Sequence, residues 1–413
     1  MQQLLIHCAI VLAVSLLVAW IVYPKILLIS INKNIVDSPN ARKLQKMPVP
    51  ILGGFVVFSG ILTSLMCVSS QVDVGSLFTI LCIMTVMLLT GLADDIISLT
   101  ARGRFLIEIF VIGVLMMSSH SLTVHNFHGL WGLYEIPIWL AVPITIVAGV
   151  GIINATNLID GIDGLSSGYC VFACALFGIF FYLTGQTLNL FLALAAIGGL
   201  IPFFMHNVFG KYSKMFIGDA GTLLMGSVMA YFVITALHIE PLEYGLGDNF
   251  GTIPMLLSIL AVPVFDTLRV MTTRILKGTS PFNPDKTHLH HMFIRLGFSH
   301  IGATVTILSL NTIVVLAWLT MYINGCSIDT QLYVVVFLNL IITVFLYQYV
   351  ECVCAKSVAT GCKLPLFVRF LKLIGHNIGM KRGTFFKFLG RWMDKCVKEE
   401  ERKKLVGGEV TIE

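Results

Sequence analysis

The chain has 413 residues, of which 57% are hydrophobic and only 12% are charged, and its formal net charge is +5. Soluble domains carry about 25% charged residues, so this composition excludes an ordinary water-soluble protein. Long apolar stretches recur along the sequence, and many are long enough to cross a hydrocarbon core of about 30 Å. We therefore predict an all-α, polytopic membrane protein with the lipid bilayer as a partner, and we expect no nucleic-acid partner.

Eleven apolar stretches are predicted to be membrane-spanning helices. The first is longer than the apolar segment of a signal peptide, and no small-residue cleavage site follows it, so we expect it to remain as a helix. We expect residues 1–350 to form a transmembrane catalytic domain and residues 351–413 to form a basic tail. The predicted spans lie near residues 4–24, 51–70, 76–92, 104–119, 137–153, 166–184, 187–205, 216–238, 251–268, 302–324 and 330–350.

Basic residues are confined to one set of connections between these spans. All 27 Lys and Arg residues lie in or beside the first, third, seventh and ninth connections or in the tail after Val350. Because Lys and Arg accumulate in cytoplasmic loops, this pattern predicts an N-terminus outside and a C-terminus in the cytoplasm. The connections on the opposite side hold carboxylates and no basic residue, namely Asp73, Glu135, Glu240, Glu243, Asp248 and Asp329.

The tail has its own pattern. Residues 364–394 mix Phe, Leu and Trp with Lys and Arg at roughly helical spacing. This is typical of amphipathic helices that lie on an anionic membrane surface. A loosely ordered basic tail explains the same composition equally well, so both interpretations stay open.

Asp94 and Asp95 form the first of four polar segments on the predicted cytoplasmic side. They lie at the end of the third predicted span. Charges at membrane depth are unfavourable, and two adjacent carboxylates also repel each other. A bound cation or a shared proton would relieve both costs. The alternative is a helix end that is simply exposed to water.

The second polar segment, residues 154–165, contains Asn154, Asn157, Asp160 and Asp163. The last three are spaced by three residues, so on a helix they would share one face. No basic residue lies nearby, so this face favours a metal ion or the neutral donor groups of a ligand. Two glycines in the same run allow a close backbone approach. A polar turn between two helices would also explain the glycines.

The third segment contains Asn207 and Asp219. Asp219 opens a long apolar span, where a carboxylate is favourable beside the positive end of the helix dipole. Taken alone, Asp219 has only this structural role. Together with the carboxylates of the first two segments, it becomes a candidate ligand for Mg²⁺, which proteins bind through one or two carboxylates and substrate phosphates.

The fourth segment is the long loop 269–301, which holds Arg269, Arg274, His288, His290 and His291. Three histidines in four positions are compatible with a zinc site. Flanked by Arg and Lys, they fit better as hydrogen-bond donors to phosphate. A solvated basic loop is the structural alternative. Carboxylates suited to Mg²⁺ and donors suited to phosphate together indicate phosphoryl-type transfer, which depends on positioning and charge neutralisation.

These motifs, in this order, resemble the polyprenyl-phosphate N-acetylhexosamine-1-phosphate transferases of the glycosyltransferase 4 type. The resemblance covers about residues 1–350 and includes the run 154–165 and the Gly-Asp-x-Gly motif around Asp219. It implies transfer of a sugar 1-phosphate from a UDP-N-acetylhexosamine to a polyprenyl phosphate such as undecaprenyl phosphate. UMP would be released, and Mg²⁺ or Mn²⁺ would be the cofactor. The implied location is the bacterial plasma (inner) membrane, with the active site on the cytoplasmic face.

The resemblance also implies roles for the acidic residues. Asp219 would be the principal metal ligand, with Asn157 close to the metal. Asp160 and Asp163 would belong to the nucleotide-sugar pocket. Asp94 would accept the proton of the lipid phosphate, with Asp95 beside it, and both would be catalytic residues.

The remaining motif residues would contact the substrates. The three histidines of the fourth segment would meet the diphosphate as catalytic residues, and Lys46 would lie near the lipid phosphate. Direct attack of the lipid phosphate and a two-step route through an aspartyl intermediate both remain open. Other residues expected to bind substrate are Asn154, Asn207, Arg269 and Arg274.

The stretch 277–291 is closest to the N-acetylglucosaminyl 1-phosphate branch, which starts lipopolysaccharide O-antigen, enterobacterial common antigen or teichoic acid linkage units. The muramyl-pentapeptide branch usually has a longer histidine run followed by an acidic residue, whereas Met292 and Phe293 follow here. Phospho-MurNAc-pentapeptide transfer remains the alternative reaction. A cation-coupled transporter is less favoured, because it would place its carboxylates at mid-span. A homodimer is compatible with the sequence.

Overall fold

The computed structural model describes residues 2–37, 48–118, 122–281, 285–360, 363–380 and 384–397. Within those ranges the regular structure is helical apart from two short antiparallel strand pairs, which confirms the predicted all-α class. The chain divides into two compact units, and the expected functional division at residue 350 is not tested by them. Unit 1 comprises Met1–Ser121, Ser166–Met229 and Arg382–Glu413, and unit 2 comprises Leu122–Leu165 and Ala230–Lys381.

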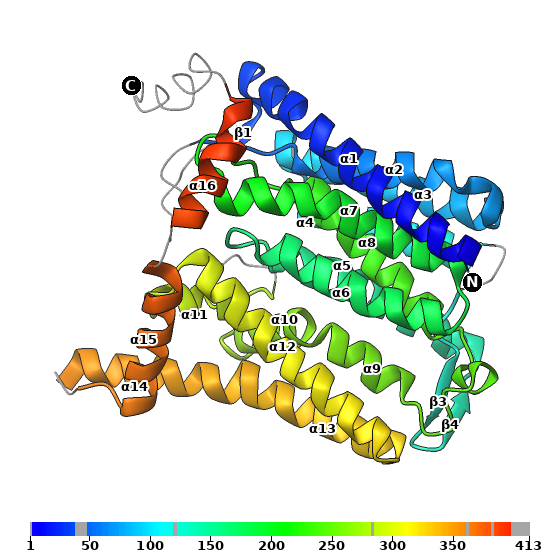
Figure 1. Ribbon diagram of the computed structural model, residues 1–413. Coiled ribbons are helices and arrows are strands. Elements are labelled where there is room, and N and C mark those ends of the chain that lie inside the picture. Colours follow the sequence, from blue (N-terminus) through cyan, green and yellow to red (C-terminus); the bar gives the residue numbers. More distant parts are fainter. Residues whose placement is uncertain are drawn as a thin grey trace. The chain divides into compact units, whose positions relative to one another are not determined.

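Unit 1 contains the first part of the chain, and the chain returns to this unit twice (Figure 1). The helix α8 begins in this unit and continues into the second one. The elements of unit 1 are α1 (Gln2–Asn32), β1 (Val36–Asp37), β2 (Val49–Pro50), α2 (Gly53–Cys67), η1 (Ser69–Gln71), α3 (Val74–Ile97), α4 (Ala101–Met116), α6 (Leu165–Leu183), α7 (Thr187–Phe209), α8 (Gly218–Ala236), α16 (Thr384–Met393) and η4 (Asp394–Cys396).

In unit 1, helices α1, α2 and α7 pack against one another through small residues (Figure 1). A Cβ atom added at Gly60 would lie 2.8 Å from the carbonyl oxygen of Ser15, and one at Gly198 would lie 2.8 Å from that of Leu12. The Ser15 hydroxyl donates a hydrogen bond of 2.6 Å to the Ala195 carbonyl. Small residues and hydroxyls of this kind allow helices to pack closely in a membrane. Close packing matters there because the hydrophobic effect does not drive helices together in lipid.

Unit 2 contains most of the second half of the chain (Figure 1). Besides the end of α8, its elements are β3 (Asn126–Leu130), β4 (Leu133–Glu135), α5 (Ile138–Leu158), η2 (Pro241–Tyr244), α9 (Thr252–Ile259), α10 (Ala261–Leu276), α11 (Leu289–Arg295), α12 (His300–Ile323), α13 (Ile328–Leu340), the π-helical turn η3 (Ile341–Phe345), α14 (Leu346–Thr360) and α15 (Leu366–Met380).

The ninth predicted span is broken into α9 and α10, which meet at Leu260 with a bend of 78°. Asn311 of α12 stabilises the break. Its side-chain oxygen accepts a hydrogen bond from the Val262 N–H (3.0 Å), and its amide nitrogen donates to the Ser258 carbonyl (3.1 Å). Pro263 has no N–H to donate, which also favours a break here. A broken helix is tolerated in a membrane when side chains bind the freed backbone groups.

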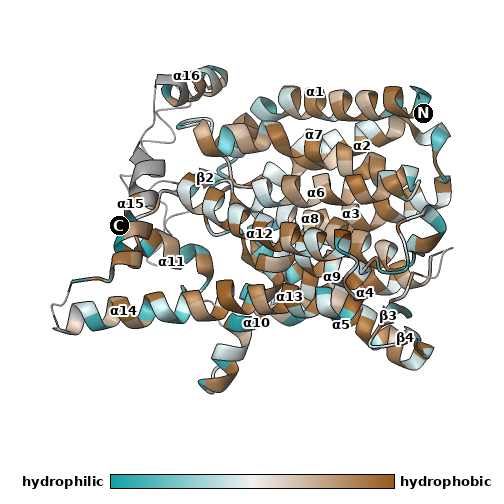
Figure 2. Ribbon diagram, turned by 60° about the horizontal axis from the view of Figure 1, so that its bottom comes forward, coloured by the Kyte–Doolittle hydropathy of each residue, from teal (hydrophilic) through white to brown (hydrophobic). Residues whose placement is uncertain are grey.

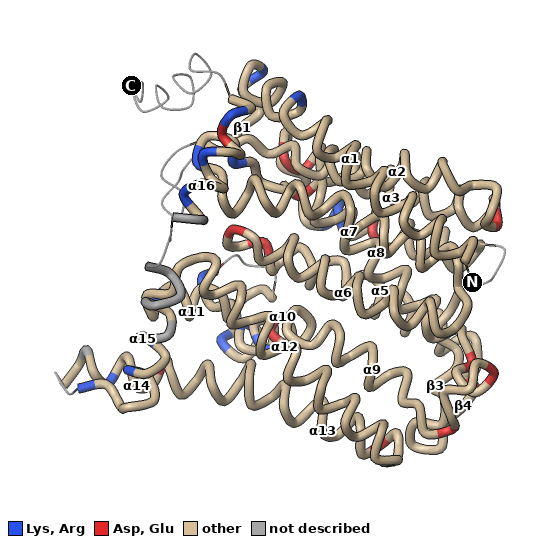
Figure 3. The backbone as a smooth tube through the Cα atoms, viewed as in Figure 1, with Lys and Arg blue, Asp and Glu red and all other residues tan. Residues whose placement is uncertain are grey.

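Eight described helices are long and apolar enough to cross a membrane, and the bent pair of α9 and α10 would make nine. The helix α2 coincides with the second predicted span but has only 15 residues. The polytopic class is therefore confirmed, whereas the count of eleven spans and the orientation of the termini stay predictions. In Figure 2, α2, α6 and α9 are mainly brown, whereas α14 and α16 mix brown with teal. In Figure 3, α9 and α12 carry few charged residues along most of their length.

The segment 364–394, predicted as an amphipathic pair, contains the helices α15 and α16, which belong to different units. Both expose large apolar side chains, so their helical form agrees with the predicted amphipathic pair. Their location at a membrane surface stays a prediction. The exposed apolar residues are Leu366, Phe367, Phe370, Leu373, Phe386, Phe388 and Trp392.

Candidate active site

In unit 1, the start of α8 is held against the ends of α2 and α3. The N–H groups of Gly53 and Gly54 donate to the carbonyls of Phe216 and Ile217, at 3.0 and 2.9 Å. A Cβ atom at Gly91 of α3 would overlap the Asp219 carbonyl oxygen. Glycine is therefore required for the close contact that brings the two ends together.

Asp95 caps the N-terminus of α8. Its two carboxylate oxygens accept hydrogen bonds from the N–H groups of Asp219 (2.9 Å) and Ala220 (3.1 Å). A carboxylate at this position binds N–H groups that have no partner within the helix and complements the helix dipole. Gly218, with φ of +70°, makes the turn before the helix. Asp95, predicted as catalytic, thus fixes the backbone of the residue predicted to bind the metal.

Asp94 points to a different set of partners. One carboxylate oxygen accepts the Leu99 N–H at 2.8 Å, and the other accepts Nη1 of Arg104 at 2.9 Å. Arg104 also lies 3.6 Å from the buried Glu108 carboxylate. No role was predicted for Arg104 from the sequence. Its guanidinium compensates the charge of Asp94, for which a bound cation or a shared proton was expected.

Asn207 holds the loop between α7 and α8. Its side-chain amide is buried and donates a hydrogen bond of 2.9 Å to the Met215 carbonyl. This contact positions the loop, and the expected role in substrate binding stays a prediction. Lys46, predicted to lie near the lipid phosphate, falls outside the described residues.

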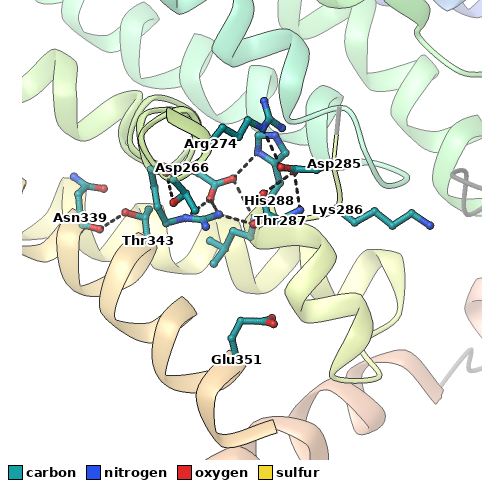
Figure 4. A network of polar contacts seen from close by, with 12 residues as sticks. Asp266, Arg274, Asp285, Lys286, Thr287, His288, Asn339, Thr343 and Glu351 are labelled. Atoms are coloured by element: carbon teal, nitrogen blue, oxygen red, sulfur yellow. Dashed lines mark hydrogen bonds and ion pairs between the residues drawn. The ribbon is translucent and has the colours of Figure 1, made fainter. Parts of the chain in front are cut away.

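In unit 2, Asp266 of α10 is the centre of a buried polar network (Figure 4). It accepts a hydrogen bond from Arg269 (2.6 Å), lies 3.0 Å from Nδ1 of His288 and accepts the Leu289 N–H (3.1 Å). The Arg269 guanidinium lies 3.8 Å above the ring centre of Tyr347. Asp266 therefore orients both a predicted substrate-binding arginine and a predicted catalytic histidine.

Asp266 was not predicted as a site residue, although the sequence contains a signal for it. A carboxylate inside the ninth predicted span needs a partner, and Arg269 follows three residues later, on the same helical face. The ion pair with Arg269 has both side chains at most 5% exposed.

The second arginine of this loop is also paired. Arg274 donates to Asp285 at 2.9 Å and to the Pro281 carbonyl at 2.6 Å. Burial alone would raise the pKa of Asp285, but the hydrogen bonds from Arg274 and Thr287 outweigh it and hold that pKa well below its usual range. Arg274 thus shapes the loop before the histidines, as Figure 4 shows.

The three histidines lie close together at the start of α11. The rings of His288 and His290 are parallel, with centres 5.7 Å apart, and that of His291 is 4.3 Å from His290. Burial, followed by the neighbouring histidines, lowers the pKa of His290 to about 3. Burial, followed by His288 and Lys286, lowers the pKa of His291 to about 4. Both rings are therefore neutral at pH 7, and each has one N–H to donate.

His290 lies against the second polar segment. Its side chain is 4% exposed, and its Nε2 has no hydrogen-bond partner among the described residues. A Cβ atom at Gly161 would overlap this imidazole. Gly161 is therefore required for contact between the histidine group and the turn that follows Asn157.

The predicted helical face of Asn157, Asp160 and Asp163 is wrong in part, because α5 ends at Leu158. Asp160 and Asp163 lie in the following turn, where Gly164 has φ of +78°. The spacing of three residues predicted a helix, but the glycines of this segment favour a turn instead.

Asp163 has a partner that the sequence did not reveal. Its carboxylate lies 2.7 Å from Nδ1 of His300, the first residue of α12. Asn154 donates to the Val150 carbonyl at 3.0 Å, within α5. The pairing of Asp163 with His300 fixes the turn at its far end.

No three His, Cys, Asp or Glu side chains converge as a metal site within the described parts of the chain. The zinc interpretation of the three histidines therefore has no geometric support. The chemistry of Asp219 fits Mg²⁺, because such sites use one or two carboxylates and complete the shell with substrate phosphates and water. Asp219 remains the candidate ligand in unit 1, and Asn157 in unit 2.

Comparison with known proteins places the chain in a family. Residues 77–237 match the model of glycosyl transferase family 4. The chain is 32% identical over 277 residues to the undecaprenyl-phosphate alpha-N-acetylglucosaminyl 1-phosphate transferase of Escherichia coli (strain K12), which covers 66% of this chain and 72% of the relative. The chain belongs to glycosyl transferase family 4.

Other relatives of the family give the same result. The protein of the same name from Yersinia pestis is 30% identical over 283 residues, which is 68% of this chain and 74% of the relative. A protein of Bacillus subtilis (strain 168), named a probable undecaprenyl-phosphate N-acetylglucosaminyl 1-phosphate transferase, is 29% identical over 301 residues, covering 73% and 81%. The predicted resemblance is confirmed. The glycosyl transferase family 4 match includes the first three polar segments and ends before the histidines.

Proposed function

We propose that this protein transfers N-acetylglucosamine 1-phosphate from UDP-N-acetylglucosamine to undecaprenyl phosphate at the cytoplasmic face of a bacterial inner membrane. The observation that carries the proposal is the set of relatives named as undecaprenyl-phosphate N-acetylglucosaminyl 1-phosphate transferases, which are about 30% identical over some two thirds of the chain. The product would be the first lipid-linked intermediate of a cell-envelope polysaccharide.

The simplest chemistry is a direct displacement. An oxygen of the lipid phosphate forms a bond to the β-phosphorus of the donor, and the bond to the UMP oxygen breaks. UMP leaves with the electron pair, so the products are undecaprenyl-diphosphate-sugar and UMP. A phosphate monoester has a second pKa of about 6, so the lipid phosphate is largely deprotonated at pH 7 without a base. Asp94, already ion-paired with Arg104, then acts mainly in positioning.

The remaining groups would act on the donor. Asp219 would hold Mg²⁺, which would neutralise charge on the diphosphate. The neutral imidazoles of His290 and His291 would donate hydrogen bonds to phosphate oxygens without adding charge. Asn157, Asp160 and the turn after α5 would contact the nucleotide or sugar. Donors aimed at developing charge are the usual source of stabilisation in phosphoryl-type transfer.

The test is UMP release by the purified full chain in detergent or nanodiscs. A panel of donors, including UDP-N-acetylglucosamine, UDP-N-acetylgalactosamine and UDP-MurNAc-pentapeptide, is offered with and without undecaprenyl phosphate. We expect release only with UDP-N-acetylglucosamine and lipid together. Release from the MurNAc donor would support the alternative reaction, and equal release without lipid would contradict transfer. Glu243→Ala, an exposed carboxylate of unit 2, is the control that keeps activity.

The same assay separates the two chemical routes. Donor labelled in the β-phosphate is incubated with the protein in the absence of lipid, and the protein is then denatured. Label that stays on the protein would support an aspartyl intermediate, and its absence from protein that is active once lipid is added supports direct displacement.

A further inference from the structure

The loop that leads from α7 into α8, residues 210–217, is held at two ends. At its C-terminal end, the Phe216 N–H donates to the Pro50 carbonyl at 2.7 Å, and Asn207 binds Met215. These contacts lie just before Asp219 in the sequence, and all of their residues belong to unit 1. The N-terminal end of the loop is held by a segment from the other end of the chain.

That segment contributes Asp394, the first residue of η4, directly after α16. One oxygen of its carboxylate accepts three consecutive backbone N–H groups, those of Lys211 (3.0 Å), Tyr212 (2.9 Å) and Ser213 (2.9 Å). Consecutive N–H groups that point inward form a concave anion site. Here a side chain of the same unit fills that site. Bonds from N–H to a carboxylate are about twice as strong as those between neutral groups.

Apolar contacts dock α16 beside this carboxylate. The ring of Trp392 lies 5.0 Å from that of Trp20 in α1, and the ring of Phe386 lies 5.4 Å from that of Phe209 in α7. A Cβ atom at Gly390 would lie 2.8 Å from the Phe209 carbonyl oxygen. The helix therefore packs closely on α1 and α7.

The position of Asp394 is unusual for a polar residue of a basic tail. Its side chain is 8% exposed, and burial of a carboxylate is unfavourable unless hydrogen bonds compensate. The three N–H bonds provide that compensation. Asp394 lies outside residues 77–237, the part of the chain that matches the family model.

We propose that Asp394 is a positioning residue for the transferase: it fixes the backbone of residues 211–213 and so sets where α8 begins and where Asp219 lies. The proposal rests on the proposed function. It gives the tail of this chain a role in the reaction. The rival role is a purely structural anchor for α16.

Hydrogen–deuterium exchange of the full chain tests the contact without any substrate. In Asp394→Ala, we expect the amides of residues 211–213 to exchange about tenfold faster, because they lose a charged acceptor. The exposed neighbour provides a matched control, and Lys395→Ala should leave the exchange unchanged. Unchanged exchange in Asp394→Ala would overturn the proposal.

Kinetics then separate positioning from anchoring. With folded variant at equal amounts, we expect Asp394→Ala to lower kcat about tenfold or more, with the KM for UDP-N-acetylglucosamine within about twofold of wild type, as a misplaced reacting group does. Faster exchange with unchanged kcat would show a structural anchor only. A wild-type protein that releases no UMP would overturn the proposed function and the positioning role together, whereas exchange would still establish the contact.

Asp394→Asn keeps the test decisive if the alanine variant does not fold. It retains one carbonyl oxygen for the three N–H groups but loses the charge. We expect its exchange rates and kcat to fall between those of wild type and Asp394→Ala, since bonds to a neutral acceptor are weaker. Wild-type exchange and wild-type kcat in Asp394→Asn would overturn the role of the carboxylate.

Discussion

Replacing Asp266 by alanine removes the carboxylate at the centre of the unit 2 network. The side chain is almost fully buried, and its partners Arg269 and His288 are buried with it. Removing one member of a buried ion pair typically costs about 3–5 kcal/mol, because the remaining charge is left without a partner. We expect Asp266→Ala to lower the free energy of unfolding by about this amount.

A double variant makes the reasoning quantitative. Arg269→Met removes the buried cation, whose guanidinium lies above the ring of Tyr347, and keeps an unbranched apolar side chain at this position. In the Asp266→Ala, Arg269→Met double variant no charge is left uncompensated, so the loss should be clearly smaller than the sum of the two single losses. Unfolding of the purified full chain is followed by circular dichroism in mixed detergent micelles. If the loss of unfolding free energy in the double variant equalled the sum of the two single losses, the two side chains would not stabilise the fold as a pair. The same would follow if Asp266→Ala were as stable as wild type.

The same substitution tests the orientation of His288. If the Asp266 carboxylate holds the Nδ1–H tautomer, its loss should lower UMP release even at temperatures where the variant is fully folded. Asp266→Asn retains an acceptor for His288 and should keep more activity than Asp266→Ala. Equal activity of the two folded variants would contradict a role in orienting the histidine.

Three further predictions concern the metal, the histidines and the turn after α5. Asp219→Ala should abolish UMP release while the protein stays folded, and chelation of divalent cations should do the same to wild type. Because the pKa values of His290 and His291 are lowered to about 3 and about 4 in the folded state, the unfolded chain binds more protons below pH 6.5. The free energy of unfolding should therefore fall as pH drops from about 6.5 to about 4, and less steeply in His291→Gln, as measured by denaturant titration. Gly161→Ala should lower kcat by up to about a hundredfold because it displaces the His290 ring, whereas Gly151→Ala in α5, with open space around it, should not.

The helices were predictable because hydropathy is a local property. Each predicted span overlaps a helix, a broken pair of helices or, at 330–350, the run of α13, η3 and α14. The break at Leu260 was not predictable from its own segment, since it depends on Asn311, which comes some fifty residues later. The composition of the span is apolar on both sides of the break. Only the position of Pro263 gave a local indication.

The sequence indicates candidate site residues by their type, but it does not indicate their partners. Asp94, Asp219 and the histidines became candidates because ionisable groups are rare in this apolar chain. The pairing of Asp94 with Arg104 and that of Asp163 with His300 require a fold that brings separate segments together. At Asp160 the local structure itself was predicted wrongly. The regular spacing of polar residues predicted a helix, whereas the adjacent glycines favour the turn that is observed.

The charge balance of unit 2 bears on how the reaction is catalysed. The two arginines expected to bind phosphate are each paired with a carboxylate, Arg269 with Asp266 and Arg274 with Asp285. His290 is neutral at pH 7, so it adds a hydrogen-bond donor and no positive charge. A diphosphate with a leaving UMP carries several negative charges that these groups do not neutralise. We therefore infer that the proposed reaction depends on a divalent cation to neutralise the negative charge of the diphosphate. The histidines would orient the diphosphate by donating hydrogen bonds.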